Sequence, residues 1–180
     1  AGFIILRLRN ILGRKTGHET KLYTDFEDRK FNIPKNNIKA SKLNHNVLEG
    51  NEKKEFLKGA EIAYETILTS FANGDAKKLK NLLTPIMATN FNEAIDSRNK
   101  EKITSEFTFI GVKESSVQKY EKIKDDLFAS VKFVSEVISV KKDKDDKIIE
   151  GNPNKIKQVT DYWKFTRNLS NTSPNWYLSE

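Results

Sequence analysis

The pattern of apolar and polar residues changes its period along the chain, from about 3.6 residues to 2. Residues 52–73 carry apolar side chains at helical spacing, from Phe56 near the start to Phe71 near the end. A stripe of this width is typical of an amphipathic helix that packs one face on a core. Asn73 and Gly74 follow, and they predict a left-handed helix end because glycine adopts positive φ without steric cost.

Two shorter helices are expected between residues 75 and 100. Asp75 is a suitable N-cap for the first of them. Thr84 with Pro85 predicts the start of the second, since proline fits the first helical position. Its inner face is expected to be formed by apolar residues at helical spacing, namely Met87, Phe91 and Ile95.

After Ile103 apolar and polar residues alternate, which is typical of half-buried strands. Strands are expected over residues 106–112, 127–140, 156–167 and 175–179, with turns at residues 141–147 and 151–153. Three helices followed by about four antiparallel strands form a segregated α+β arrangement. We expect the sheet to curve over the helices as a cone with an apolar interior.

The hairpin at residues 159–178 contains both tryptophans of the chain, so its sheet is expected to supply much of the core. Asp161 lies in phase with Trp163 and Phe165, and a carboxylate on a packed face is costly unless it is paired. We predict a structural ion pair of Asp161 with Arg98, at the end of the facing helix, or with Arg167, on the same strand face. The alternative is a catalytic Asp161 that lines an open pocket.

Six aromatic residues are candidates for this interior, as core or as the walls of a ligand pocket: Tyr64, Phe71, Phe91, Phe133, Trp163 and Phe165. The core interpretation is preferred. An apolar pocket for a lipid tail or a peptide segment is kept as the alternative.

The composition argues against most catalytic chemistry. The chain has 180 residues and no cysteine, which excludes disulfides, thiolate metal sites and a cysteine nucleophile. Its two histidines, His18 and His45, lie far apart in a segment without regular pattern. Neither the spacing of zinc ligands nor a glycine-rich phosphate loop is present. We therefore expect no enzyme activity, no metal and no cofactor.

The positive charge is concentrated near the N-terminus. Residues 1–50 contain 10 Lys and Arg against 5 Asp and Glu, whereas residues 51–180 contain 22 against 20. Residues 1–17 combine a short apolar run with basic residues, as at the exit end of a transmembrane helix. A frayed amphipathic helix on the domain or on a neighbour is the alternative. The residues predicted to contact an anionic membrane are Phe3, Ile4, Ile5, Leu6, Arg7, Leu8, Arg9, Arg14 and Lys15. Residues 18–51 are predicted to be a linker, and residues 52–180 the folded domain.

Several short motifs, in order, resemble one family. They lie at residues 56–67, 71–75 and 91–98 of the helices, and at residues 150–153, 159–167 and 174–178 of the last strands. Together they are similar to the Tim44-like domain family, which includes the mitochondrial inner-membrane translocase subunit that tethers the import motor and the bacterial TimA-type adaptors. The resemblance covers about residues 52–179 and implies an NTF2-like fold.

The resemblance also implies a membrane-associated adaptor related to protein translocation or membrane-protein biogenesis. Its expected place is the cytoplasmic face of a bacterial inner membrane, or the matrix face of the mitochondrial one. Its expected partners are anionic lipid and a protein, with translocase or chaperone components as candidates. A ribosome-docking protein would need a basic domain, and the near-neutral residues 51–180 argue against this and against nucleic acid. The alternative from a different class is a pocket protein that binds or transforms a small apolar ligand through Asp161.

Overall fold

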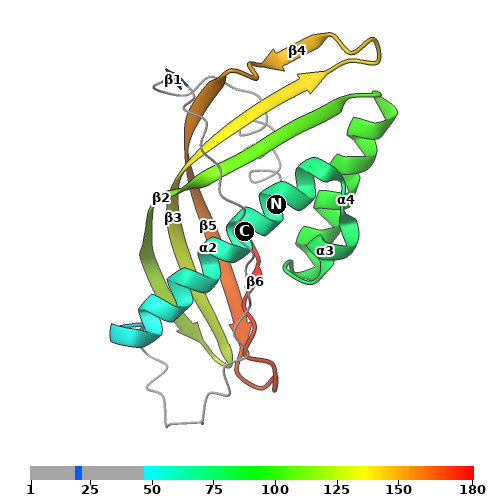
Figure 1. Ribbon diagram of the computed structural model, residues 1–180. Helices are drawn as coiled ribbons and strands as arrows, with labels where there is room; N and C mark the ends of the chain where they lie inside the picture. The colour runs from blue at the N-terminus through cyan, green and yellow to red at the C-terminus, as the bar shows by residue number, and fades with distance from the viewer. Residues whose placement is uncertain (1–18, 22–46) are drawn as a thin grey trace.

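The computed structural model describes residues 19–21 and 47–180. In this part of the chain, three helices lie on one side of an antiparallel sheet of six strands (Figure 1). The helices are α2 (Gly50–Asn73), α3 (Ala76–Lys80) and α4 (Pro85–Lys100), and the strands are β1 (Glu19–Lys21), β2 (Thr104–Ile123), β3 (Asp126–Lys142), β4 (Ile148–Gly151), β5 (Lys155–Asn168) and β6 (Tyr177–Leu178). The predicted α+β class, with helices first and a curved sheet after them, is confirmed.

The sheet is built around β3, in the order β1-β5-β3-β2. β2 pairs with β3 along its full length, so β5 and β4 share the other edge of β3. The register between β2 and β3 shifts at three places, near Ile110, Lys113 and Gln118. Such bulges increase the local twist and bend the strand, which curves the sheet around α2.

The helix ends agree with the local sequence. Gly74 has φ 71°, and its N–H bonds the carbonyl oxygens of Phe71 and Ser70. The Asp75 carboxylate accepts a hydrogen bond of 3.1 Å from the backbone N–H of Lys78 and so caps α3. Thr84 and Pro85 begin α4 as predicted.

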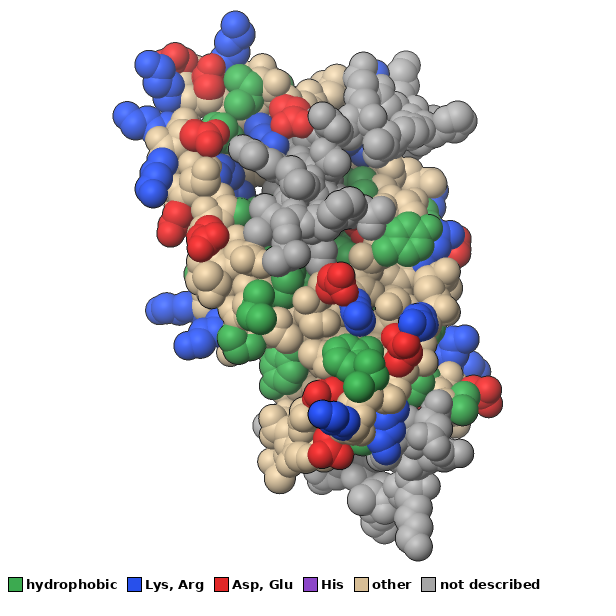
Figure 2. Space-filling view, turned by 180° about the vertical axis from the view of Figure 1, so that it is seen from behind, with side chains coloured by type: hydrophobic (Ala, Val, Ile, Leu, Met, Phe, Trp, Pro, Cys, Tyr) green, Lys and Arg blue, Asp and Glu red, His purple; other side chains and the backbone are tan. Residues whose placement is uncertain are grey.

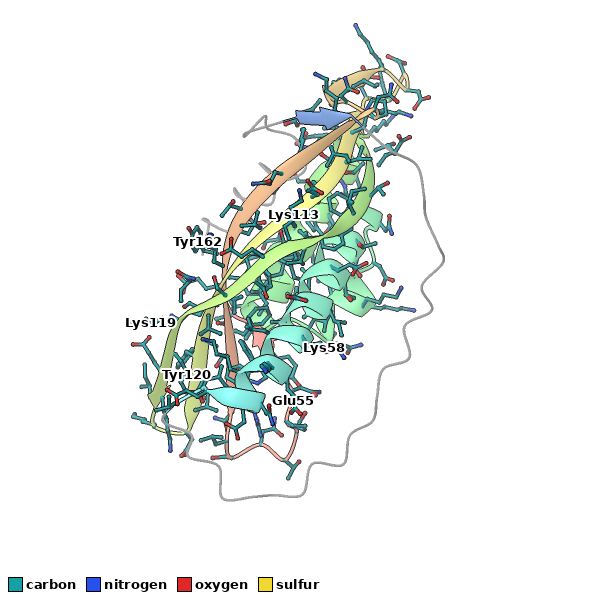
Figure 3. All side chains as sticks on the ribbon, turned by 60° about the vertical axis from the view of Figure 1, so that its left-hand side comes forward. Glu55, Lys58, Lys113, Lys119, Tyr120 and Tyr162 are labelled. Atoms are coloured by element: carbon teal, nitrogen blue, oxygen red, sulfur yellow. The ribbon has the colours of Figure 1, made fainter. Side chains whose placement is uncertain are left out.

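The core lies between α2, α4 and the inner face of the sheet. Alternate residues of β3 and β5 are buried, as the period of two predicts. The predicted inner stripe of α4, Met87, Phe91 and Ile95, is buried as well. The opposite face of the sheet carries no helix in the described part of the chain, and Tyr162 there points away from the helices (Figure 3).

A short C-terminal strand joins the helices to the sheet. Leu178 is fully buried and pairs with Phe165 of β5. Its N–H donates to the carbonyl oxygen of Leu82 at 2.8 Å, and its own carbonyl oxygen accepts from the Thr84 N–H at 3.0 Å. Backbone hydrogen bonds on both sides of Leu83 therefore join the connection between α3 and α4 to β6, which in turn pairs with β5.

Three features differ from the expectation, and the first is β4, which forms between two predicted turns by pairing with β3. β2 continues to Ile123, beyond the predicted end at residue 112, because a polar edge strand can be held by its pairing with β3 alone. β1 lies in the segment predicted as linker and pairs with β5, so this part of the segment contacts the domain. Within the described residues, no helix has both the length and the apolar character needed to cross a bilayer.

Candidate functional site: a buried polar cluster under α2

Three polar side chains meet in the core under the middle of α2. The Tyr64 hydroxyl donates a hydrogen bond to Oδ2 of Asp161 at 2.7 Å, and Oγ of Ser135 lies 2.9 Å from the same hydroxyl. A tyrosine hydroxyl has one proton, so Ser135 is the donor of the second bond. The cluster thus links α2 with β3 and β5, and none of its members is more than 1% exposed.

Aromatic rings enclose this cluster. The Tyr64 ring stacks on Phe133, with ring centroids 4.3 Å apart, and meets Trp163 edge to face at 4.6 Å. Phe133 lies directly opposite Asp161 in the pairing of β3 and β5. Apolar walls of this kind strengthen the hydrogen bonds of the cluster, because water does not compete for them.

The environment keeps Tyr64 in its neutral form. Burial raises the pKa of the Tyr64 hydroxyl far above its usual range, and the negative charge of Asp161 raises it further. A neutral hydroxyl can donate to a carboxylate at every pH near neutrality. A general base must reach the proton that it abstracts, and the buried Asp161 has its carboxylate turned to Tyr64. This geometry fits a structural role for Asp161.

The structure places the Asp161 carboxylate beside the Tyr64 hydroxyl, and the two arginines of the predicted ion pair belong to other parts of the fold. Arg167 shares the strand face, but six residues separate it from Asp161, which is about 20 Å along a strand. The guanidinium of Arg98 lies 5.4 Å from the centre of the Phe71 ring, about two helical turns beyond Tyr64. Burial lowers the pKa of Arg98.

The six aromatic candidates all belong to the core. Phe91 and Phe133 are fully buried, and the most exposed of the six, Phe71, is 6% exposed. They contact one another in pairs, such as Phe71 with Phe91 at 5.2 Å and Trp163 with Phe165 at 6.3 Å. The interior that they form is filled by their own rings.

The surface of the domain carries mixed charge. Lys113 pairs with Glu136 at 2.6 Å, and Lys132 with Glu114 at 3.2 Å, on the side of the sheet away from the helices. Figure 2 shows acidic, basic and apolar side chains interspersed on this side. Tyr162 is 48% exposed there, and Ile62 of α2 is 42% exposed on the helical side. The predicted membrane-binding residues, from Phe3 to Lys15, lie outside the described residues.

Comparison with known proteins decides the family. The model of the Tim44-like domain matches residues 45–180. The chain belongs to the Tim44-like domain family. The match begins seven residues before the predicted start of the domain, at residue 52. No curated protein matches the chain.

The Tim44-like domain has a distant structural neighbour in the intermembrane space region of the chloroplast protein ARC6. The two are 11% identical with a TM-score of 0.45, over 69% of this chain and 92% of that one. The family itself is associated with membrane-bound adaptors of protein translocation.

The polar cluster was only partly predictable. The strand alternation predicts a buried carboxylate at Asp161, and the helical stripe of α2 predicts Tyr64 as a core aromatic. Their contact joins residues 97 positions apart, and it depends on the position of α2 along the sheet. The sequence signal for this contact is a tyrosine in the apolar stripe of a helix combined with a carboxylate on the buried face of a strand.

Proposed function

We propose that this Tim44-like protein is a non-enzymatic adaptor that holds a protein partner at an anionic membrane. In this proposal residues 3–15 bind the membrane and residues 52–180 form the domain that binds the partner. Components of a translocase or of a chaperone system are the candidate partners. The inner membrane is the proposed location, on its cytoplasmic face in a bacterium or its matrix face in a mitochondrion.

The observation that carries the proposal is the filled interior of the domain. Core aromatic rings occupy the space under the helices, and the Asp161 carboxylate binds Tyr64 there. A domain of this kind offers its outer surface for binding. This supports an adaptor over the small-ligand alternative, in which Asp161 would line an open cavity.

The basic residues of the tail support the membrane part of the proposal. Arg7, Arg9, Arg14 and Lys15 follow an apolar run. Each basic residue near an anionic bilayer contributes about 1 kcal/mol, and inserted aliphatic side chains add to this. The positive charge of these four residues exceeds the net charge of the domain, in which 22 Lys and Arg stand against 20 Asp and Glu.

The edge of β2 supports the protein-binding part. β2 is 20 residues long, and within the described residues only β3 pairs with it. An exposed strand edge can accept an extended peptide as an additional strand. Tyr120, Lys113 and Lys119 lie along this strand and would contact the side chains of such a peptide (Figure 3).

The test is co-sedimentation with vesicles that contain or lack anionic lipid. One variant replaces Arg7, Arg9, Arg14 and Lys15 by Gln, which retains β1. A second begins at Asn51. The matched control replaces four exposed lysines of the domain by Gln and changes the net charge equally: Lys54, Lys58, Lys77 and Lys80.

The full chain and the control variant are expected to sediment with anionic vesicles only. The tail variant and the truncated chain are expected to bind at least about tenfold more weakly, because most of the electrostatic attraction is lost. Equal binding of the truncated chain would assign the membrane contact to the domain. Absence of binding by the full chain would remove the membrane from the proposal.

A further inference from the structure

The short strand β1 limits where the tail joins the domain. Glu19 pairs with Lys157, and Lys21 with Lys155, at the start of β5. Four peptide units separate Lys15 from Glu19, and they span at most about 14 Å. This chain length limits how far the β1 end of the sheet can lie from a membrane that the last basic residue of the tail binds.

A protruding hairpin lies at this same end of the sheet. It comprises residues 141–151, with the end of β3, a tight loop and β4, and we name it the β3–β4 tip. Figures 1 and 3 both show β1 and β4 at one end of the sheet, away from β6. β4 continues into β5 through one turn, and β1 pairs with the first residues of β5. A short segment of the chain therefore connects the tip to the place where β1 pairs.

The β3–β4 tip exposes two adjacent isoleucines. Ile148 is 45% exposed and Ile149 is 50% exposed. Neighbouring residues of a strand point to opposite faces, so the domain cannot cover both. A pair of β-branched apolar residues at a projecting loop gains free energy by entering the boundary between lipid headgroups and acyl chains.

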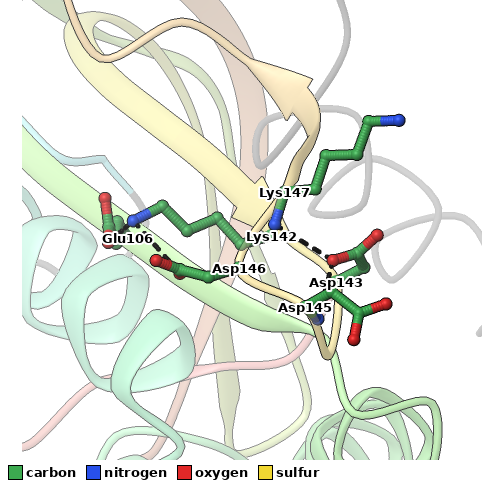
Figure 4. A network of polar contacts seen from close by, with 6 residues as sticks. All are labelled: Glu106, Lys142, Asp143, Asp145, Asp146 and Lys147. Carbon is green, nitrogen blue, oxygen red and sulfur yellow. Dashed lines mark hydrogen bonds and ion pairs between the residues drawn. The ribbon is translucent and has the colours of Figure 1, made fainter.

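Most carboxylates of the tip are bound within it. Glu150 pairs with Lys141 at 2.7 Å, and Asp146 pairs with Lys142 at 3.4 Å. Asp143 accepts hydrogen bonds from the backbone N–H groups of Asp145 and Lys147, at 2.9 and 3.0 Å (Figure 4). The two ion pairs neutralise Glu150 and Asp146, whereas Asp143 and Asp145 keep their charge, so the four lysines and four acidic residues of the tip balance.

Two lysines of the tip remain available to an anionic surface. Lys144 and Lys147 are exposed, and neither belongs to an ion pair of the described residues. The Lys147 side chain extends away from the loop (Figure 4). Cations beside an inserting apolar pair are the arrangement that binds an anionic bilayer surface.

Close backbone contacts hold the tip against the end of β3. Gly151 has φ 91°, and a Cβ at this position would lie 2.0 Å from the carbonyl oxygen of Ser139. Only glycine allows β4 to approach β3 so closely. The loop is closed by a hydrogen bond of 3.0 Å from the Asp143 N–H to the Lys147 carbonyl oxygen. Ile148 and Ile149 therefore lie between two contacts that hold β4 at the end of β3.

We propose that the β3–β4 tip docks on the same anionic membrane that the tail binds, with Ile148 and Ile149 entering the headgroup region and Lys144 and Lys147 facing lipid phosphates. This inference rests on the proposed membrane function of the tail and adds an orientation to it. The sheet then stands with its β1 end on the membrane, and β6 and the start of α4 face away from it.

The absence of cysteine from the chain makes the test direct. Ile149→Cys in the full chain is labelled with a fluorophore whose emission shifts to the blue in an apolar environment. Ile86→Cys is the matched control, because Ile86 is 70% exposed. It lies near Thr84, which bonds Leu178 beside Phe165 and Ala129. Ala129 is twelve residues from Lys141 along β3, or about 40 Å.

The label at residue 149 is expected to shift to the blue with vesicles of phosphatidylcholine and phosphatidylglycerol, and not with phosphatidylcholine alone. The label at residue 86 is expected to stay unchanged. In the unlabelled full chain, Ile148→Asn with Ile149→Asn is expected to weaken vesicle binding about fivefold, through loss of the inserted side chains.

The outcomes separate this inference from the proposed function by co-sedimentation of the same labelled samples. Sedimentation with a silent label at residue 149 would overturn the tip and leave the tail as the membrane contact. A shift at residue 86 would assign a different docking surface. Failure of both labelled chains to sediment would overturn the tail and the tip together.

Discussion

The middle of the sheet and the β3–β4 tip use polar residues in opposite ways. Under α2, Tyr64, Ser135 and Asp161 are buried and bind one another. At the tip, Lys141 and Glu150 form an ion pair whose side chains are 14% and 30% exposed. The first set lies beneath a helix, whereas water reaches the second. We therefore expect the cover over a strand, more than its alternation, to decide what its polar residues contribute to stability.

Typical free energies of such contacts indicate how much the two regions should differ in stability. A hydrogen bond to a buried charged group contributes about 1.5–3 kcal/mol, and loss of one partner leaves the other unsatisfied. A solvent-exposed ion pair contributes about 0–1 kcal/mol. The polar contacts of the two regions are therefore expected to differ severalfold in their contribution to the free energy of unfolding. The following substitutions test this comparison by urea unfolding.

Phe133→Ala is expected to have the largest effect. Phe133 is fully buried, stacks on Tyr64 and contacts Trp163 and Phe165. Removal of a buried phenylalanine ring leaves a cavity and costs about 3–5 kcal/mol. A loss below about 1 kcal/mol would show that the rings around the cluster are loosely packed.

Tyr64→Phe is expected to lower the free energy of unfolding by about 2 kcal/mol. The ring remains, but the Asp161 carboxylate loses the donor that lies 2.7 Å from Oδ2. Tyr120→Phe is the matched control, since Tyr120 is a half-buried tyrosine outside the cluster. Equal losses in the two variants would contradict the special role of Tyr64.

The stabilising effect of the Tyr64 hydroxyl is expected to depend on pH. The pKa of Tyr64 is raised in the folded protein, first by burial and then by Asp161. In the unfolded chain a tyrosine loses its proton near pH 10, so the folded state binds the extra proton above that pH. Stability is then complete below pH 10 and falls as the pH rises further. The difference between the wild-type chain and Tyr64→Phe should shrink above pH 10 and stay constant between pH 6 and 9.

Gly151→Ala is expected to cost about 1 kcal/mol globally. A methyl group would collide with Ser139, and the positive φ adds strain. The tip lies at the end of the sheet, so β4 can detach and relieve the collision without opening the core. Hydrogen exchange should accelerate in residues 148–151 and stay unchanged around Phe133. Accelerated exchange throughout β3 would show that the tip and the core are one cooperative unit.

Glu150→Gln is expected to have the smallest effect, at most about 0.5 kcal/mol. The substitution removes the charge that pairs with Lys141 while it retains the size of the side chain. A partly exposed ion pair contributes little because water and salt screen it. A loss comparable with that of Tyr64→Phe would remove the contrast between the two regions.

The sequence allowed the elements to be predicted where the local pattern is strong. The end of α2 at Gly74, the cap at Asp75 and the start of α4 at Pro85 all follow from local rules. The inner faces of β3 and β5 follow from alternation. These features depend on neighbours in the chain, and they agree with the structure.

Features that depend on distant pairing could not be predicted. β1 has the sequence Glu-Thr-Lys, which has no apolar pattern, and it is a strand only because β5 offers an edge. The second half of β2 is likewise polar, and it is a strand because it pairs with β3. The partner of Asp161 required the register between α2 and the sheet, which brings Tyr64 to Asp161 and leaves Arg167 about 20 Å away.

The backbone hydrogen bonds of Leu178 with Leu82 and Thr84 have a consequence for biosynthesis. A nascent chain that has emerged as far as Asn168 contains all three helices and the strands from β2 to β5, but not the residue that bonds Leu82 and Thr84 to the sheet. In such a chain the connection between α3 and α4 lacks its hydrogen bonds to β6. We expect the core residues next to Phe165 to stay accessible to other proteins until Leu178 has emerged and joined the sheet.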